Sequence, residues 1–467
     1  MLRRKLWLFL PIALVAVGLG IYTLLVTPRR FFQCLSAPAR YLSRPDGSEQ
    51  RAELPPFQNG NRLRLLVNGD EALPALLDII DGAEESIRWQ VMLFAPDSTG
   101  EALAGALARA AGRGVRVQLS FNIDQTVNGT IADGYSREKK QQLNRQMERI
   151  LVNLRQAGVE VLANPSGADF PLEQAGPEAR AIQQQIQANT CVNANHIDHR
   201  KILIIDSHTA FIGGMNVGSS YLFTVPPDAE ADMVEEAARR AREGLPEPWE
   251  KWFDAAAIVE GPVVEQMARS FNWRWEVLGG SAIAPQPVEA LPDGVPVQWL
   301  EQRPGNPQVG AQMMQLIENA QQEIWVASPF VSYDPALEAL GSAAQRGVRV
   351  VFVTPGKHQE MPLSRRIFRE LADEMVADGV EVYFNDRRMA HTKLLVVDGQ
   401  ETLVGSFNLN YRSFLHDLEA GALVDDPAFA REVIERVFQP YLAISTPVTE
   451  PLNVPWNPLN WIIKPFT

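Results

Sequence analysis

An internal repeat limits the folds that are open to this chain of 467 residues. Residues 110–117 read AAGRGVRV and residues 343–350 read AAQRGVRV, so that seven of the eight positions agree. Each copy ends an amphipathic helix at a glycine and enters an apolar strand, and another helix and strand precede each copy in the same order. These earlier helices and strands are expected at 71–83, 86–91, 312–320 and 323–328. The repeat predicts an α/β fold of two pseudo-symmetric halves, each a mixed sheet flanked by helices.

The repeat also places the same reactive residue types at the same spacing in both halves. The order is His-x-Lys-x4-Asp, then six residues, then Gly-x-x-Asn. The residues are His199, Lys201, Asp206 and Asn216 in the first half, and His391, Lys393, Asp398 and Asn408 in the second. A histidine and a lysine two positions apart on a strand point to the same face, so their side chains can converge on one phosphate.

This pattern is typical of phosphodiester chemistry. An unprotonated imidazole can attack phosphorus, cations and amides can hold the oxygens, and a second imidazole can protonate the departing alkoxide. The catalytic candidates are His199, Lys201, Asp206, His391, Lys393 and Asp398, and the candidates for phosphate binding are Asn216, Ser406 and Asn408. Gly214 stands where the second half has Ser406, which predicts one phosphate contact fewer on the first side. The alternative is that both histidines are ordinary core residues. A single motif could be explained in this way, but two motifs with the same spacing argue against it.

Composition excludes other kinds of site. The formal net charge of −13 argues against a nucleic-acid groove, which binds phosphates through clustered lysine and arginine. Cys34 and Cys191 are the two cysteines, too few for a zinc knuckle or a disulfide framework, although a single bridge between them stays open. We therefore expect neither a metal ion nor another cofactor.

The N-terminus carries a candidate membrane anchor. Residues 6–26 have no charged side chain, and a helix of this length, at about 1.5 Å per residue, spans a bilayer core. A cleaved signal peptide is the competing interpretation, but the apolar run is long for one and lacks a small-x-small site. Arg3, Arg4 and Lys5 precede the run, so the positive-inside rule predicts a cytoplasmic N-terminus and a catalytic part across the membrane.

These features divide the chain into five segments. They are an anchor at 1–30, a juxtamembrane linker at 31–60, a first half at 61–285, a second half at 286–450 and a tail rich in aromatic residues and proline at 451–467. The first half carries two insertions, at 167–194 and 217–248, and the tail lies either at the membrane interface or on the domain as a strap.

Over residues 62–445 the two motifs and the duplicated halves resemble the phospholipase D superfamily, and within it the bacterial cardiolipin synthases. The resemblance implies two phospholipase D-like halves that share one site, a phosphohistidine intermediate without a metal, and His199 as the nucleophile. It also implies an acidic residue that orients each histidine, with Glu419 serving His391 and Asp254 serving His199.

The same resemblance implies a phospholipid substrate. The charge asymmetry around residues 6–26 predicts an inner-membrane location, with the catalytic part in the periplasm. The expected reaction is phosphatidyl transfer between two phosphatidylglycerol molecules. Hydrolysis of phospholipids, a membrane-tethered phosphodiesterase or nuclease, and a non-catalytic lipid-binding scaffold are the alternatives. The anchor and the acidic balance argue against the nuclease, and two intact motifs argue against the scaffold.

Overall fold

The computed structural model describes residues 53–122, 137–164, 197–222, 252–303, 305–357, 362–386, 388–450 and 452–455, together with residues 460 and 464. The predicted anchor, both cysteines, the insertion at 167–194 and most of the insertion at 217–248 lie outside these residues. None of the described helices combines the length and apolar character that a bilayer crossing requires.

The first half alternates strands and helices in the order that the sequence predicts. Its elements are β1 (Gln58–Val67), α3 (Asn68–Asp81), β2 (Ser86–Val91), α4 (Ser98–Gly112), β3 (Arg116–Phe121), α6 (Arg137–Gln156), β4 (Glu160–Ala163), β5 (Ile202–Ile205), β6 (Thr209–Gly213), β7 (Ala255–Glu260) and α9 (Val263–Val277). Strand β1 begins at Gln58, inside the range that we expected to be linker.

The second half repeats this order. Its elements are β8 (Val295–Arg303), β9 (Asn306–Pro307), α10 (Gln308–Asn319), β10 (Glu323–Ala327), α11 (Asp334–Gln345), β11 (Arg349–Pro355), α12 (Pro362–Ala377), β12 (Glu381–Asn385), β13 (Leu394–Val397), β14 (Glu401–Gly405), α13 (Tyr411–Leu415), β15 (Glu419–Asp425), α14 (Pro427–Val433), the π-helix η3 (Ile434–Phe438), α15 (Gln439–Ala443) and β16 (Ser445–Pro447).

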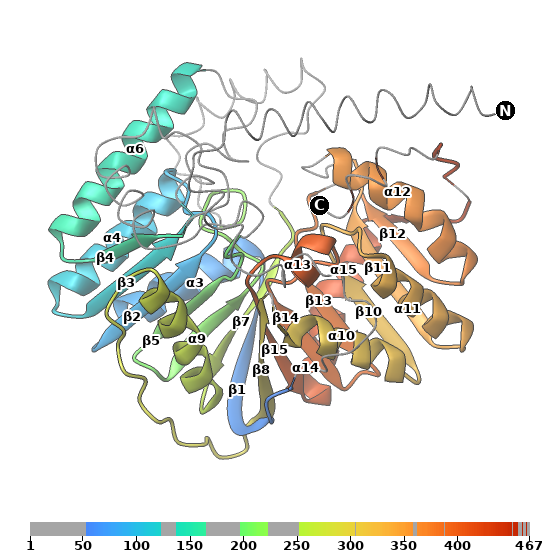
Figure 1. Cartoon of the computed structure of the whole chain (residues 1–467), viewed down its shortest axis with the longest axis horizontal. Helices are drawn as coiled ribbons and strands as arrows, with labels where there is room; N and C mark the ends of the chain where they lie inside the picture. Colours follow the sequence, from blue (N-terminus) through green and yellow to red (C-terminus); the bar gives the residue numbers. More distant parts are fainter. Residues whose placement is uncertain are drawn as a thin grey trace.

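The described strands form one continuous sheet that is symmetric about its middle. Its order is β16-β12-β11-β10-β13-β14-β15-β8-β1-β7-β6-β5-β2-β3-β4, with β9 paired to β8. Strands β1 and β8 meet antiparallel at the centre, and the two halves lie to either side of them (Figure 1). In each half three strands run parallel (β2-β3-β4 and β10-β11-β12) and the motif strands β5 and β13 pair antiparallel to the first of them. The predicted α/β fold with mixed sheets is confirmed.

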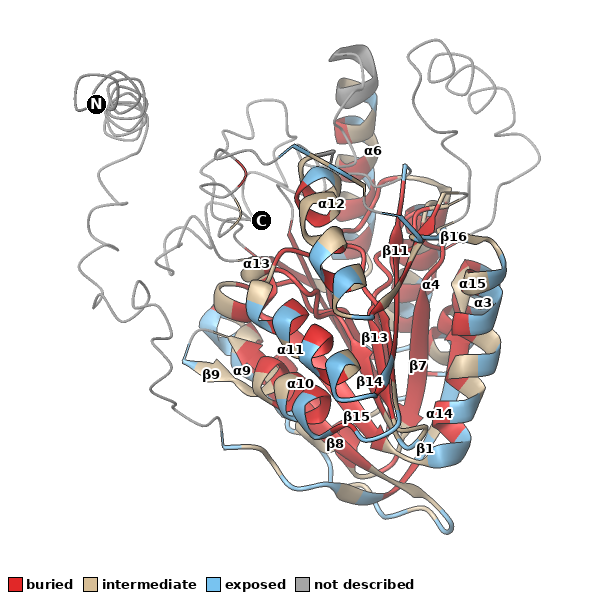
Figure 2. Cartoon of the chain, turned by 90° about the vertical axis from the view of Figure 1, so that its right-hand side faces the viewer, coloured by how far each residue is buried: buried red, intermediate tan, exposed pale blue. Residues whose placement is uncertain are grey.

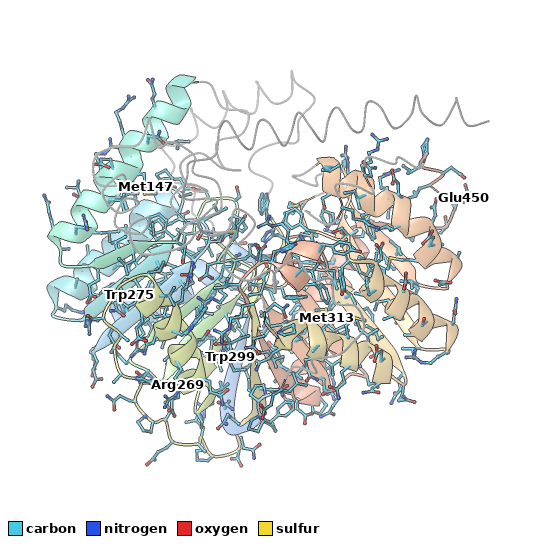
Figure 3. The ribbon with its side chains drawn as sticks, in the orientation of Figure 1. Met147, Arg269, Trp275, Trp299, Met313 and Glu450 are labelled. Atoms are coloured by element: carbon cyan, nitrogen blue, oxygen red, sulfur yellow. The ribbon has the colours of Figure 1, made fainter. Side chains whose placement is uncertain are left out.

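Helices cover both faces of the sheet. In Figure 2, α9, α10 and α11 lie on one side, and α3, α14 and α15 lie on the other. The motif strands β5 and β13 read ILII and LLVV and are buried at every position, as expected for strands that are covered on both faces. One hydrophobic core runs through both halves and includes Trp275 on α9 and Trp299 on β8 (Figure 3). The site is therefore held by rigid, buried strands.

Candidate active site

Each motif histidine is hydrogen-bonded through its backbone to the other half of the chain. The His199 N–H donates to Leu418 O at 2.8 Å, just before β15 in the second half. The His391 N–H donates to Phe253 O at 2.7 Å, just before β7 in the first half. Isolated bridges at Asp198–Leu418 and Phe253–Ala390 extend these contacts. Because each motif crosses to the opposite half, the two motifs meet at one place beside the centre of the sheet.

The acidic partner of each histidine also comes from the opposite half. His199 Nδ1 lies 2.9 Å from both carboxylate oxygens of Glu419, and His391 Nδ1 lies 2.8 Å from Oδ2 of Asp254. The expected pairing of Glu419 with His391 and of Asp254 with His199 is therefore wrong. Glu419 and Asp254 stand at the starts of β15 and β7, and these starts are the places where the opposite motif forms its backbone hydrogen bonds.

These pairs fix which nitrogen of each ring is available for chemistry. Because Nδ1 of both histidines is held by a carboxylate, Nε2 is the atom left to react with a phosphate. Burial lowers the pKa of His199 and of His391 well below the usual value, and the nearby lysine ammonium groups lower both further. The neutral imidazole is the form that a nucleophile requires, whereas a proton on His391 depends on the adjacent Asp254 carboxylate to stabilise it.

The two motif lysines turn back toward their own histidines. Lys201 Nζ donates to His199 O at 2.6 Å, and Lys393 Nζ donates to His391 O at 2.7 Å. Lys393 Nζ also lies 3.0 and 3.1 Å from the two ring nitrogens of His391. Burial lowers the pKa of Lys201 to about 7, and the positive charge of Lys393 adds to this effect. The cations of both halves are therefore close enough to act on the same anion.

The acidic partners are shielded from water. The Glu419 and Asp254 side chains are completely buried. Burial raises the pKa of each carboxyl to about 7, against the opposing effect of the two lysines. Carboxyls that titrate near neutral pH beside an imidazole can hold or release a proton at little cost, which general acid–base catalysis requires.

The aspartates of the two motifs lie elsewhere. Asp206 accepts hydrogen bonds from the N–H groups of Glu84, Glu85 and Ser86 at 2.7–2.8 Å. Asp398 accepts them from Gln321, Gln322 and Glu323 at 2.7–3.2 Å.

Each motif aspartate is separated from its histidine by the length of a four-residue strand, about 13 Å at ~3.3 Å per residue. The prediction that Asp206 and Asp398 are catalytic is wrong. They fix the loop between the first helix and the following strand of each half.

The three predicted phosphate ligands are buried beside the motifs, but Ser406 is already engaged. Its hydroxyl donates to Glu419 Oε2 at 2.5 Å and accepts the Ala420 N–H at 3.1 Å. Asn216 Oδ1 accepts the Leu93 N–H at 3.1 Å. Asn408 Oδ1 is buried without a hydrogen-bond partner in the described part of the chain. The Asn408 oxygen thus keeps the capacity to accept a hydrogen bond from a donor, whereas Ser406 holds the acid.

The exchange of Ser406 for Gly214 follows from the size of the acid. A Cβ on Gly214 would lie 2.5 Å from Oδ1 of Asp254, so the short aspartate fills the space that a serine would need. In the second half the longer Glu419 leaves room for Ser406 and also accepts a hydrogen bond from Ser413 at 2.6 Å. We expected this difference to alter a phosphate contact, but it alters the support of the acid.

Sequence reasoning missed several residues around the histidines. Rings of Tyr221, Trp252 and Phe330 lie 5.0, 5.3 and 6.2 Å from the His391 ring. On the His199 side, Arg412 and Asp417 form an ion pair at 2.7 Å. Ser413, which supports Glu419, is placed by α13, whose first turn is capped by Asn410. Residues 411–413 read Tyr-Arg-Ser and lie shortly before Glu419, which is a signal for Arg412 and Ser413, whereas nothing in the sequence links the aromatic residues to His391.

His196 is a candidate for the same pocket because it lies three positions before His199 in the sequence, but it falls outside the described residues. Among the residues that are described, no cluster of three or more histidine, cysteine, aspartate or glutamate side chains is arranged to hold a metal ion.

A duplicated α/β layer with two histidine–lysine pairs at its centre defines a phospholipase D-type enzyme, and comparison with known proteins agrees. The family model described as "Cardiolipin synthase, PLD-like domain" matches residues 76–241 and 313–440. The chain belongs to this family.

Named relatives point the same way. Cardiolipin synthase A of Edwardsiella ictaluri (strain 93-146) is 28% identical over 419 residues, which covers 87% of this chain and 73% of the relative. Cardiolipin synthase A of Erwinia tasmaniensis is 27% identical, and the match covers 83% of this chain and 70% of the relative. The crystal structure of a phosphatidylserine synthase from Haemophilus influenzae Rd KW20 superposes with a TM-score of 0.59 at 14% identity, covering 89% of this chain and 95% of that one, and shares the fold.

Proposed function

We propose that this protein transfers a phosphatidyl group through a phosphohistidine and that it makes cardiolipin from two phosphatidylglycerol molecules. The observation that carries the proposal is the crossed pair of buried histidine–carboxylate contacts, His199–Glu419 and His391–Asp254, beside two lysines. The cardiolipin synthase relatives support the choice of substrate.

In the first step, Nε2 of His199 attacks the phosphorus of a phosphatidylglycerol. The bond between phosphorus and the glycerol oxygen breaks, and the departing oxygen takes a proton from His391. The phosphatidyl group is then bound to His199 and free glycerol leaves. Lys201 and Lys393 are placed to hold the phosphate oxygens, where cations stabilise the charge of the transition state, and the Nδ2 group of Asn408 would be the donor that this side chain adds.

In the second step, a hydroxyl of another phosphatidylglycerol gives its proton to His391 and attacks the phosphorus. The bond to His199 breaks, and cardiolipin leaves. His391 must therefore cycle between its protonated and neutral forms, and the adjacent Asp254 carboxyl, with its pKa near 7, stabilises the protonated ring when it is ionised. We assign the nucleophile to His199 by resemblance to the superfamily.

The proposal includes an inner-membrane location, with the segment at 6–26 as a single-pass anchor and the catalytic part in the periplasm. Its support is the apolar run and the basic residues before it. A lipid substrate requires a site within reach of a bilayer, which such an anchor supplies.

The test is to incubate the purified full-length protein with isotopically labelled phosphatidylglycerol in mixed micelles and to identify the products by mass spectrometry. The expected products are cardiolipin and glycerol in equal amounts. Phosphatidic acid without cardiolipin would establish hydrolysis instead. Lys201→Ala and Lys393→Ala proteins should both lose most of the turnover, since one shared site needs both halves, and full activity in either would contradict a shared site.

A further inference from the structure

Three aromatic side chains from both halves of the chain lie against the ring of His391. Tyr221 and Trp252 come from the first half, with ring centroids 5.0 and 5.3 Å from that of His391, and Phe330 comes from the second half at 6.2 Å. The rings of Tyr221 and Trp252 also contact each other at 4.4 Å, and the Trp252 N–H donates to Ser220 O at 3.2 Å. Tyr221, Trp252 and Phe330 together are the aromatic shell.

The backbone directs Trp252 to the side of the chain that carries the site. Trp252 and Asp254 are two positions apart in the segment that leads into β7 and bridges to the second half, so their side chains point to the same face. Asp254 is the carboxyl that holds His391. Phe253, between them, points the other way and packs on Tyr441 at 4.6 Å between ring centroids.

The aromatic shell covers only one of the two histidines. The side chain of His391 is 3% exposed, against 10% for His199. Within the described part of the chain no aromatic ring contacts His199, whose neighbours are charged and include the Arg412–Asp417 ion pair. In the proposed mechanism His391 exchanges protons with the alcohols. The shell therefore lies where the acceptor has to meet its base.

An aromatic lining discriminates between water and an alcohol. A water molecule bound inside a protein needs about two to four polar partners. Apart from one phenol hydroxyl and one indole N–H, the aromatic shell has none to offer. An alcohol can pack its carbon atoms against the rings while its hydroxyl reaches Nε2 of His391. The lining thus favours an acceptor with a carbon skeleton.

We propose that the aromatic shell excludes water from His391 and so directs the phosphatidyl group to an alcohol. The proposal rests on the proposed function. In the competing reaction the oxygen of water attacks the phosphorus, a proton of that water passes to His391, the bond to His199 breaks and phosphatidic acid leaves. Transfer and hydrolysis share one intermediate and one proton carrier, and the rings around the carrier decide between them.

The test measures how the intermediate divides between acceptors. The full-length protein is incubated with phosphatidylglycerol in mixed micelles that contain deuterated glycerol, and mass spectrometry quantifies cardiolipin, deuterated phosphatidylglycerol and phosphatidic acid in one sample. Trp252→Leu should raise the ratio of phosphatidic acid to the two transfer products by about 10- to 100-fold, because a hydroxyl buried without partners carries a penalty of that size and the variant relieves it. Partial unfolding or a slower first step lowers all three products together and leaves the ratio unchanged.

Trp273→Leu is the matched control, because this tryptophan lies on α9 with 38% of its surface exposed and stacks with Arg303. It should leave the ratio unchanged. Trp252→Phe keeps a ring in the shell and should stay close to the wild-type ratio. Phe330→Leu opens the shell from the second half and should raise the ratio as well, which decides the question if Trp252→Leu does not fold.

An unchanged ratio in folded Trp252→Leu and Phe330→Leu proteins would overturn the proposal even if turnover falls, since the rings would then only support the surrounding structure. A wild-type protein that makes mainly phosphatidic acid would overturn it as well. If the wild type exchanges glycerol but makes no cardiolipin, the proposed reaction with a second phosphatidylglycerol fails, while the ratio of phosphatidic acid to deuterated phosphatidylglycerol still tests the shell.

Discussion

Replacing Glu419 by glutamine, and Asp254 by asparagine, separates the two halves of the reaction. Because Glu419 holds His199, the first change should slow the attack on phosphorus. Because Asp254 holds His391, the second should slow proton transfer to and from the alcohols. Both amides keep the size of the acid, so the buried surroundings stay filled.

The size of the effect follows from the contact. The Glu419 side chain is fully buried, with both oxygens 2.9 Å from His199 Nδ1. A hydrogen bond to a charged group contributes about 1.5–3 kcal/mol, which corresponds to a loss of about 10- to 100-fold in the rate of attack. An amide NH2 facing Nδ1 would also fix the ring proton on Nε2, the atom that must attack, and this wrong tautomer adds to the loss.

The assay uses a phosphatidyl ester of p-nitrophenol, a leaving group that needs little protonation. Asp254→Asn should release a burst of nitrophenol and accumulate phosphatidyl-enzyme, whereas Glu419→Gln should show a burst slowed by the factor above. Two reference variants frame these results. His391→Ala should show a burst of nitrophenol, and His199→Ala should show none. Intact-protein mass spectrometry locates the adduct, and thermal melting checks that each variant is folded.

The reasoning is refuted if Glu419→Gln keeps the burst and Asp254→Asn loses it. A phosphatidyl adduct on His391 in the His199→Ala protein would reverse the roles of the two histidines. It would not contradict the contacts of His199 with Glu419 and of His391 with Asp254. Equal slowing of the burst in both amide variants would contradict the division of labour itself.

The remaining predictions concern stability, pH, metals and topology. Asp206→Ala should lower the free energy of unfolding by about 2–4 kcal/mol because three N–H groups lose their acceptor, with the activity of the folded fraction unchanged; urea titration checks this against the exposed Glu84→Gln. Burial lowers the pKa of Lys201 to about 7, so its ammonium is lost as the pH rises through that value and the KM for lipid should rise; a KM that stays flat between about pH 6 and 9 contradicts this. Dialysis against EDTA should leave the rate unchanged, and a rate restored only by divalent ions would count against a metal-free site. Alkaline phosphatase fused to the C-terminus should be active if the anchor at 6–26 places the catalytic part in the periplasm, and a fusion that fluoresces as a cytoplasmic reporter would reverse that topology.

The sequence predicted the elements of each half well because their signals are local. The glycines that end α4 and α11, Gly114 and Gly347, have φ values of 96° and 94°, a conformation in which glycine carries no steric penalty, and each is followed by the predicted strand. The helices predicted at 71–83 and 312–320 correspond to α3 and α10 within a few residues.

The sequence could not predict which acid serves which histidine. The repeat aligns Glu419 with Asp254, but the choice between a partner in the same half and one in the opposite half depends on how β7 and β15 lie against the motifs. That packing is a property of the whole sheet. The prediction that the motif aspartates are catalytic was wrong for a related reason. The spacing of residues along a strand does not show at which end of the strand the site lies.

The crossed contacts also explain why a duplicated chain gains something that two identical chains lack. In a symmetric dimer of one half, each subunit would complete the other's histidine, and the twofold axis would make the two histidines equivalent. Joining the halves in one chain removes that constraint. Ser406 and Ser413 can then support one acid while Gly214 makes room for the other, and an arginine–aspartate pair can flank one ring while tryptophan and tyrosine flank the second. With both halves in one chain, the surroundings of a nucleophile and of a proton carrier can therefore differ.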